Sequence, residues 1–206
     1  MRLEGRSALV TGGSRGIGSA IAMAVAKEGA DVVIGYVERR EAAERVVRSI
    51  TGLGRKAIAL AADISNQEEA ASLVDRAASF LGKLDLLVNN AGMSWEQGRL
   101  VADSDPVLAR RVIEVNFLGS FYCTRAALPH LRRERERADV IFISSTGTKH
   151  WHAGNAPYIA SKAAMEAFAR CLAREEQPNN MYYGSVGPTI PLTETSGQIR
   201  VNVVAP

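Results

Sequence analysis

The sequence is poor in cysteine and contains no long apolar run. It has two cysteines, Cys123 and Cys171, and both fall inside helical patterns. A disulfide framework is therefore not expected, whereas a reducing compartment such as the cytoplasm is. No apolar run approaches the roughly 18 residues that would cross a membrane, and the segment MRLEGR leads directly into an apolar strand. We therefore expect neither a membrane span nor a signal peptide.

Aromatic residues and an excess of one charge are also scarce. The formal net charge is +3, and aromatic residues make up 6% of the chain. In the most basic stretch, residues 132–137, arginines alternate with Glu134 and Glu136, which is typical of a solvated helix end. Nucleic acid is therefore not an expected partner.

The chain does have the apolar content of an ordinary globular domain. Apolar residues make up 47% of its 206 residues, so we expect residues 1–206 to form one domain with a full core. A second domain is not expected. One segment, 177–198, is rich in Gly, Pro, Ser, Thr and Asn, and we expect it to be mobile or poorly packed.

Apolar segments with the spacing of strands alternate with segments that have the spacing of helices. This alternation predicts an α/β fold with a single doubly wound parallel sheet, a Rossmann domain that binds ligands at the carboxyl ends of its strands. We expect strands at residues 6–10, 31–37, 56–62, 84–88, 140–144 and 201–205. The expected helices cover a segment that ends at 29 and residues 41–53, 67–81, 106–131 and 157–174.

A tyrosine and a lysine lie one turn apart on the last predicted helix. Tyr158 and Lys162 share a helix face, and Ser145 lies thirteen residues before Tyr158 at the end of a predicted strand. An ammonium group beside a phenol favours the phenolate, so the pair suits proton transfer to or from a carbonyl or alcohol oxygen. The serine hydroxyl would hold that oxygen. Chance occurrence on an amphipathic helix is the alternative explanation for the pair alone.

The first predicted strand runs into the glycine-rich turn TGGSRGIG, residues 11–18, and then a helix. This arrangement points backbone N–H groups and a helix N-terminus at a pyrophosphate. Its spacing, G-x-x-x-G-x-G, differs from the general G-x-G-x-x-G fingerprint. A glycine-rich turn needed only for backbone reasons is the alternative.

The end of the second predicted strand carries no acidic residue of its own. An acid there would bind a ribose 2′-hydroxyl and repel a 2′-phosphate. Arg15, Arg39 and Arg40 instead favour a 2′-phosphate, and therefore NADP over NAD, although Glu38 acts in the opposite direction. A solvent-facing role for Arg39 and Arg40 is the alternative.

Three further polar positions follow strands or interrupt a helix. Asp63 and Ile64 follow the third predicted strand, where the acid would accept from an adenine amino group or only cap a turn. Asn89-Asn90-Ala91-Gly92 follows the fourth strand, where small residues let the backbone pass close to a flat ligand or simply form a turn. Asn116 lies among apolar neighbours, and we expect it to break its helix locally or to organise water.

These motifs occur in the order and approximate spacing of the short-chain dehydrogenase/reductase family, which the chain resembles over about residues 5–176 and again at IRVNVVAP, 199–206. Similar members include 3-oxoacyl-[acyl-carrier-protein] reductases and glucose dehydrogenases. The resemblance implies Tyr158 as the general acid/base, Lys162 as the group that favours its ionised form and binds the nicotinamide ribose, Ser145 as the group that orients the substrate oxygen, and Asn116 as the holder of a relay water. It implies that the cofactor contacts Gly12, Ser14, Arg15, Gly16, Ile17, Gly18, Tyr36, Arg39, Asp63, Ile64, Asn90, Ala91, Gly92, Tyr158 and Lys162.

The carboxyl end departs from the family pattern. Residues 177–198 precede the strand IRVNVVAP, and part of them, GPTIPLTET at 187–195, resembles the segment that members carry after that strand. This order implies that the substrate-covering segment and the last strand are missing or displaced, and it puts activity and assembly into a homotetramer or dimer in question.

The leading hypothesis is a cytoplasmic NADP-dependent oxidoreductase acting on a small-molecule carbonyl or secondary alcohol. The alternatives are an NAD-dependent sugar or alcohol dehydrogenase and a nucleotide-binding protein without turnover. A metal is not expected, since His150 and His152 have no cysteine or acidic partner nearby in the sequence. With Trp151 and Trp95, these histidines are expected to line the substrate pocket.

Overall fold

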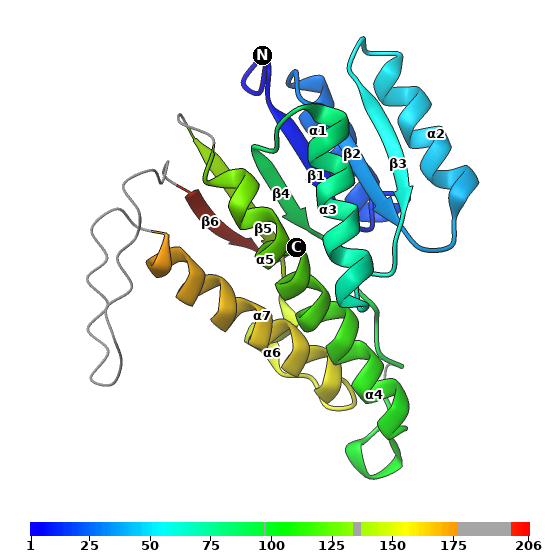
Figure 1. Ribbon diagram of the computed structural model, residues 1–206. Coiled ribbons are helices and arrows are strands. Elements are labelled where there is room, and N and C mark those ends of the chain that lie inside the picture. The colour runs from blue at the N-terminus through cyan, green and yellow to red at the C-terminus, as the bar shows by residue number, and fades with distance from the viewer. Residues whose placement is uncertain (97, 134–136, 177–198) are drawn as a thin grey trace.

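The computed structural model describes residues 1–96, 98–133, 137–176 and 199–206. These residues build one parallel six-stranded sheet with the order β3-β2-β1-β4-β5-β6 and helices on both faces (Figure 1). The predicted fold class, a doubly wound parallel sheet, is confirmed. The strands are β1 (Ser7–Val10), β2 (Asp31–Tyr36), β3 (Ala57–Ala61), β4 (Leu86–Asn89), β5 (Ala138–Ile143) and β6 (Ile199–Val204).

Two apolar clusters fill the space between the sheet and its two helix layers. One contains Ala22 and Ile50 with Ala8 and Val32 of the strands, and it packs α1 (Gly16–Lys27) and α2 (Arg40–Thr51) against one face. The other contains Leu9 and Val33 and packs α3 (Gln67–Leu81), α5 (Gly119–Leu131) and α7 (Ala156–Glu175) against the opposite face. Successive strand residues therefore point to opposite layers, which is why both kinds of position are apolar.

The helical elements are α1 (Gly16–Lys27), α2 (Arg40–Thr51), α3 (Gln67–Leu81), a 3₁₀ turn (Val101–Asp103), α4 (Pro106–Ile113), α5 (Gly119–Leu131), α6 (Gly147–His150) and α7 (Ala156–Glu175).

The boundaries of α3 follow from local chemistry. The Asn66 side chain accepts hydrogen bonds from the backbone N–H groups of Glu68 and Glu69, and Gly82 ends the helix with a φ of 83°. An asparagine cap and a left-handed glycine are common signals for the start and end of a helix. The helix spans Gln67–Leu81, which confirms the predicted bounds of 67–81.

The long segment predicted at 106–131 is interrupted, as expected, at Asn116. Between α4 and α5 the chain forms a π-helical turn, Glu114–Leu118, centred on this fully buried residue. The Ser120 hydroxyl donates to the Asn116 carbonyl oxygen over 2.9 Å. Such π turns often occur at functional sites, because they re-aim a side chain without ending the helix.

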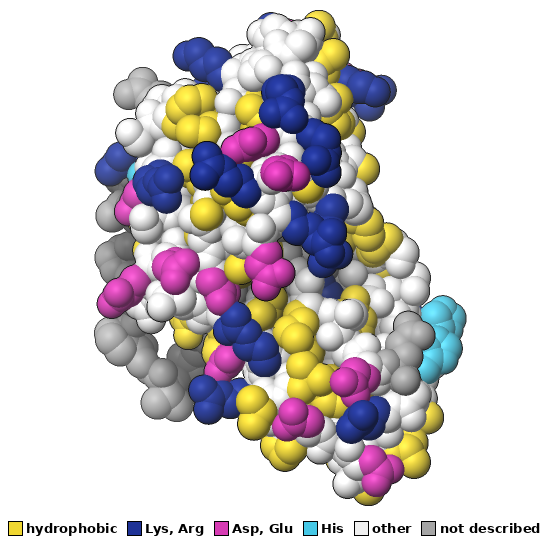
Figure 2. Space-filling view, turned by 90° about the vertical axis from the view of Figure 1, so that its right-hand side faces the viewer, with side chains coloured by type: hydrophobic (Ala, Val, Ile, Leu, Met, Phe, Trp, Pro, Cys, Tyr) yellow, Lys and Arg dark blue, Asp and Glu magenta, His cyan; other side chains and the backbone are white. Residues whose placement is uncertain are grey.

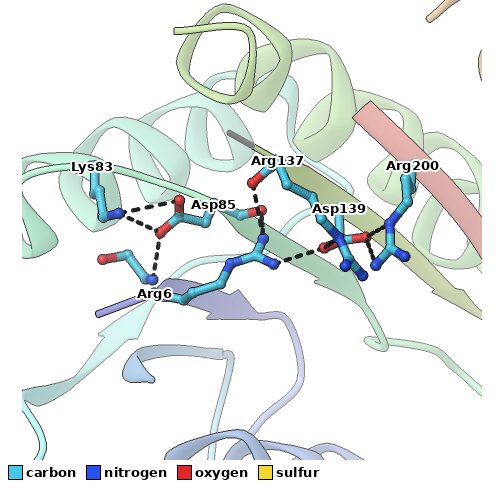
Figure 3. Close-up of polar contacts among 7 residues, drawn as sticks. Arg6, Lys83, Asp85, Arg137, Asp139 and Arg200 are labelled. Atoms are coloured by element: carbon cyan, nitrogen blue, oxygen red, sulfur yellow. Dashed lines mark hydrogen bonds and ion pairs between the residues drawn. The ribbon is translucent and has the colours of Figure 1, made fainter. Parts of the chain in front are cut away.

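The amino ends of four strands are joined by charged side chains. Asp139, 5% exposed, binds the guanidinium groups of Arg6 at 3.0 Å and Arg200 at 2.6 Å (Figure 3). Arg6 also donates to the backbone oxygen of Asp85, whose carboxylate accepts from the Ser7 N–H at 2.7 Å. The cluster thereby ties the starts of β1, β4, β5 and β6 together.

The surface of the α2 and β3 side carries basic and acidic side chains interspersed with each other (Figure 2). Within the described ranges, none of the helices combines the length and the apolar character that a membrane span requires. The atypical segment predicted at 177–198, and with it the expectation of a displaced lid, lies outside the described residues.

Candidate active site

The turn between β1 and α1 brings chain segments closer together than side chains would allow. Gly12 has a φ of +66°, and a Cβ atom there would lie 2.8 Å from the Ala91 Cα. A Cβ atom on Gly18 would lie 2.3 Å from the Gly12 carbonyl oxygen. α1 begins at Gly16 without a side-chain cap. Its first N–H groups, supported by the helix dipole, therefore suit a phosphate.

The segment after β4 holds this turn in place. The Asn90 side-chain amide donates to the carbonyl oxygens of Thr11 at 2.9 Å and Gly12 at 3.2 Å. The backbone N–H groups of Asn90 and Ala91 both donate to the Thr11 hydroxyl at 3.0 Å. The structure thus brings together two predicted motifs that lie about 80 residues apart in the chain. Asn90 acts here by shaping the glycine turn.

Asp63 lies at the carboxyl end of β3, next to a cation that the sequence did not reveal. Its carboxylate accepts from the Ser65 N–H and hydroxyl, at 3.0 and 2.7 Å, and pairs with Arg111 of α4. Burial alone would raise the pKa of Asp63, but the hydrogen bonds from Ser65 and Arg111 outweigh it and lower the pKa. The adjacent Ile64 is buried against Gly119. An adenine amino group that binds Asp63 would therefore donate to an ionised carboxylate that Ser65 and Arg111 already hold in place.

The predicted arginines at the end of β2 are not equivalent. Arg40 is paired with Glu44 at 2.8 Å, whereas Arg15 and Arg39 are exposed and form no ion pair within the described part of the chain. Tyr36 is half-buried at the end of the strand. Arg15 and Arg39 are therefore exposed guanidinium groups that a ligand at this edge could bind without breaking an ion pair.

Lys162 is buried on α7 beside the end of β5. It is 4% exposed, and its ammonium group donates to the Ile143 carbonyl oxygen over 2.7 Å. Burial lowers the pKa of Lys162 to about 8. The ammonium nitrogen lies 6.0 Å from the centroid of the Tyr158 ring. A Cβ atom on Gly92 would lie 3.5 Å from the same nitrogen, so the predicted residues Gly92, Tyr158 and Lys162 meet at one place.

Asn116 connects three parts of the site. Its side-chain oxygen accepts from the Met93 N–H at 2.7 Å, while its amide donates to the Met93 oxygen at 3.0 Å and to the Ser161 hydroxyl at 2.9 Å. Ser161 in turn donates to the Tyr158 carbonyl oxygen over 2.6 Å. The π turn thus aims one amide at both the loop after β4 and α7, beside Lys162.

Ser145 follows β5 at the start of the short helix α6. Its hydroxyl oxygen accepts from the Gly147 N–H at 3.1 Å, and its carbonyl oxygen accepts from the Thr148 N–H at 3.1 Å. Ser145 is only partly buried, as is Tyr158. Both hydroxyl-bearing residues therefore lie at the carboxyl edge of the sheet and are partly open to solvent.

The aromatic residues expected in the substrate pocket differ in exposure. Trp95 is 4% exposed and Trp151 is 79% exposed, with a positive φ of 39°. The exposed rings of His150 and His152 stack with centroids 6.3 Å apart. Across the described ranges no group of three or more His, Cys, Asp or Glu side chains is placed to hold a metal ion.

The sequence missed several residues that build the site. Met93, Ser161 and Arg111 were not identified, although each binds a predicted residue. Met93 and Ser161 could have been suspected from their positions beside the NNAG turn and Lys162. Arg111 offers no such local signal, because its partner Asp63 lies 48 residues away.

The fold and this site define a class of protein, the α/β oxidoreductases that use a nicotinamide dinucleotide at the carboxyl edge of a parallel sheet. Comparison with known proteins agrees with this class. A family model described as short chain dehydrogenase matches residues 6–205. The chain therefore belongs to the short chain dehydrogenase family, and the resemblance seen in the motifs is confirmed.

Individual relatives extend the comparison. The chain is 40% identical to the versicolorin reductase of Emericella nidulans over 189 residues, which are 91% of this chain and 69% of the relative. It is 35% identical to a 3-oxoacyl-[acyl-carrier-protein] reductase of Staphylococcus aureus over 183 residues, 89% of this chain and 73% of the relative. A crystal structure of a short chain dehydrogenase from Burkholderia cenocepacia in complex with NADP matches all of this chain and 75% of its own, with a TM-score of 0.85 and 37% identity.

Proposed function

We propose that the protein is an NADP-dependent oxidoreductase that transfers a hydride between nicotinamide and a carbonyl or secondary alcohol, with Tyr158 as the general acid/base. The observation that supports this most is the position of Lys162. Its buried ammonium group lies 6.0 Å from the Tyr158 ring centroid, beside Gly92 and Asn116. A cation at this place favours the phenolate form, which a proton-transferring tyrosine requires.

The residues present fit a nicotinamide dinucleotide. Gly12 and Gly18 leave a cradle that any side chain would fill, and Gly92 leaves room beside Lys162. We assign the pyrophosphate to the turn 12–18, the adenosine to Tyr36, Asp63 and the segment at Asn90, and the nicotinamide ribose to Tyr158 and Lys162. When bound, the cofactor supplies or accepts the hydride.

The protein's own groups then handle the substrate oxygen. The Ser145 hydroxyl donates a hydrogen bond to that oxygen, and Tyr158 gives or takes its proton. Asn116 keeps α7 and the Met93 loop in register through its three side-chain hydrogen bonds. The two relatives named above by sequence are reductases, and on this support we propose carbonyl reduction as the main direction.

The exposed, unpaired arginines support NADP as the preferred coenzyme. A 2′-phosphate needs positive charge at the end of β2, and Arg15 and Arg39 supply it while Arg40 is occupied by Glu44. Arg15→Ala should weaken NADPH binding about tenfold or more and leave NADH binding nearly unchanged. Arg40→Ala is the matched control and should change neither affinity by more than about twofold. Equal losses for both coenzymes would favour the NAD-dependent alternative, which Glu38 supports.

Tyr158→Phe tests the proposed chemistry. NADPH oxidation with a panel of ketones should fall by about 10³-fold or more, while the NADPH dissociation constant changes little. Retained turnover would remove Tyr158 from the mechanism. Tight NADPH binding by the wild-type chain without any turnover would instead favour a nucleotide-binding protein.

The expectations of a cytoplasmic protein, of one domain over residues 1–206 and of a homotetramer or dimer stay predictions. Sedimentation velocity of the full chain measures the assembly state directly. A purely monomeric sample would contradict the expected oligomer.

A further inference from the structure

Glu166 is a buried acid on the same helix stripe as the candidate catalytic pair. It follows Lys162 by one turn of α7 and Tyr158 by two, so the three side chains point toward the same side of the helix. Glu166 is 7% exposed. A buried carboxylate is costly unless it is hydrogen-bonded, so the partners of Glu166 indicate which residues it positions.

Those partners are the hydroxyl groups on either side of Ser145. One Glu166 carboxylate oxygen accepts from the Ser144 hydroxyl at 2.5 Å and from the Thr148 hydroxyl at 2.8 Å. The other oxygen lies near the exposed cations Lys149 at 3.7 Å and Arg170 at 3.5 Å. Burial would raise the pKa of Glu166, but the hydrogen bonds from Ser144 and Thr148, helped by the two cations, lower it. Glu166 is therefore ionised at neutral pH.

The same contacts reach the residues that flank Ser145. The Thr148 hydroxyl lies 2.9 Å from the Ser145 carbonyl oxygen as well as 2.8 Å from Glu166. Its single proton is attracted most strongly by the ionised carboxylate, whereas the Thr148 backbone N–H donates to the Ser145 carbonyl oxygen at 3.1 Å and links the two residues. Just before Ser145, the Ile143 carbonyl oxygen is held by Lys162 at 2.7 Å. Residues 143–148 are therefore attached to α7 through the two side chains that follow Tyr158 on its stripe.

We propose that Glu166 is a positioning residue, which fixes Ser144 and Thr148 and through them the Ser145 hydroxyl relative to Tyr158 and Lys162. This inference rests on the proposed function. Glu166 acts only through Ser145 and touches neither substrate nor cofactor. An apolar residue of similar size would fill the same space, but it would leave two buried hydroxyl groups without this acceptor.

Glu166→Ala and Glu166→Gln form the first test. In the alanine variant, kcat for ketone reduction by NADPH should fall about 10- to 100-fold, with the NADPH dissociation constant within about twofold of wild type. The glutamine variant keeps an acceptor oxygen and should recover kcat to within about threefold of wild type. Arg170→Ala, which removes only an exposed ion pair, should leave kcat unchanged. A Glu166→Ala enzyme that loses thermal stability but keeps its kcat per folded molecule would overturn the proposal.

A double-mutant cycle with Ser145→Ala separates positioning from general damage. If Glu166 acts through Ser145, adding Glu166→Ala to Ser145→Ala should lower kcat by less than about twofold further. Full additivity of the two losses would show that Glu166 acts elsewhere, and it would contradict the proposal.

Hydrogen exchange of the full chain with NADPH provides a readout that does not need turnover. Glu166→Ala should speed exchange of the amides at 147–151, which include the N–H groups of Gly147 and Thr148 bonded to Ser145, and Arg170→Ala should not. If the wild-type chain reduces no ketone but exchange responds in this way, the proposed function fails and the positioning stands. If the wild type is active and exchange does not respond to Glu166→Ala, the positioning fails and the function stands.

Discussion

The two ends of the parallel sheet differ in whether their buried charges are paired with opposite charges. At the amino end, Asp139 is surrounded by the guanidinium groups of Arg6, Arg137 and Arg200. At the carboxyl end, Lys162 is equally buried but has no carboxylate partner within the described ranges, and burial lowers its pKa to about 8. The charges at one end are mutually neutralised, whereas the unpaired ammonium at the other carries a desolvation cost, which the proposed catalytic role of Lys162 would explain.

Lys162→Met should give the largest effect, with opposite signs on activity and stability. Turnover at pH 7 should fall about 10³-fold, because the cation beside Tyr158 is gone. The free energy of unfolding should rise by up to roughly 3 kcal/mol, because the penalty for burying the ammonium disappears. Steady-state kinetics and urea unfolding at pH 7 measure the two quantities.

The pH dependence of that stability gain has a defined sign. The pKa of Lys162 is about 8 in the folded chain and 10.5 as its ordinary value, so the unfolded chain binds more protons between these pH values. Wild-type stability therefore rises from pH 8 to 10.5 relative to the methionine variant. The variant's advantage should be full below pH 8 and vanish near pH 10.5; an advantage that is constant with pH would contradict the account.

Asp139→Ala, at the amino end, should lower stability and leave activity unchanged. Removing the acid leaves Arg6 largely buried without its carboxylate, and breaking such a pair costs about 3–5 kcal/mol of unfolding free energy. Activity per folded molecule should not change, because the cluster lies at the other end of the sheet. A loss of kcat with intact stability would remove the distinction between the two ends.

Asn116→Ala should produce a smaller loss of stability together with a loss of activity. The Met93 N–H and carbonyl groups lose their partners, which costs about 2 kcal/mol, and α7 loses its tie to the loop after β4. The matched control is Asn66→Ala, which removes a helix cap and should cost about 1 kcal/mol with no change in kcat. Unfolding midpoints and kcat values for both variants show whether Asn116 affects activity as well as stability.

Gly92→Ala should have the smallest effect, and it tests whether the nicotinamide ribose binds beside Gly92. The new methyl group would lie 3.3 Å from the Asn116 side-chain oxygen and 3.5 Å from the Lys162 nitrogen. Stability should change by less than about 1 kcal/mol, since these contacts are only slightly tight. The NADPH dissociation constant should rise a few-fold in a titration followed by fluorescence. Unchanged affinity would place the nicotinamide ribose away from Gly92.

Local signals explain what the sequence predicted well. The bounds of α3 follow from Asn66 and Gly82, and the irregular turn at Asn116 follows from placing an amide among apolar neighbours. The other long helices and the strands were placed to within a few residues, because hydrophobic periodicity identifies elements better than it identifies their ends. The short helix α6 and the 3₁₀ turn Val101–Asp103 were not predicted.

The contacts between distant residues were not predictable in the same way. Arg111 with Asp63 and Glu166 with Ser144 depend on how separate elements pack, and the sequence contains no sign of that register. Trp95 and Trp151 were given the same pocket-lining role, yet one is 4% exposed and the other 79%. Burial of this kind is decided by tertiary packing and not by residue type.

The pKa of the Lys162 side chain tests the central claim most directly. NMR titration of the full chain, with Lys162→Met used to assign the signal, measures it without any substrate or cofactor. A value of about 8 is predicted, since the ammonium is buried without an acidic partner. A value at or above 10.5 would show that the carboxyl end of the sheet stabilises this charge as fully as the amino end stabilises Asp139, and it would contradict the account.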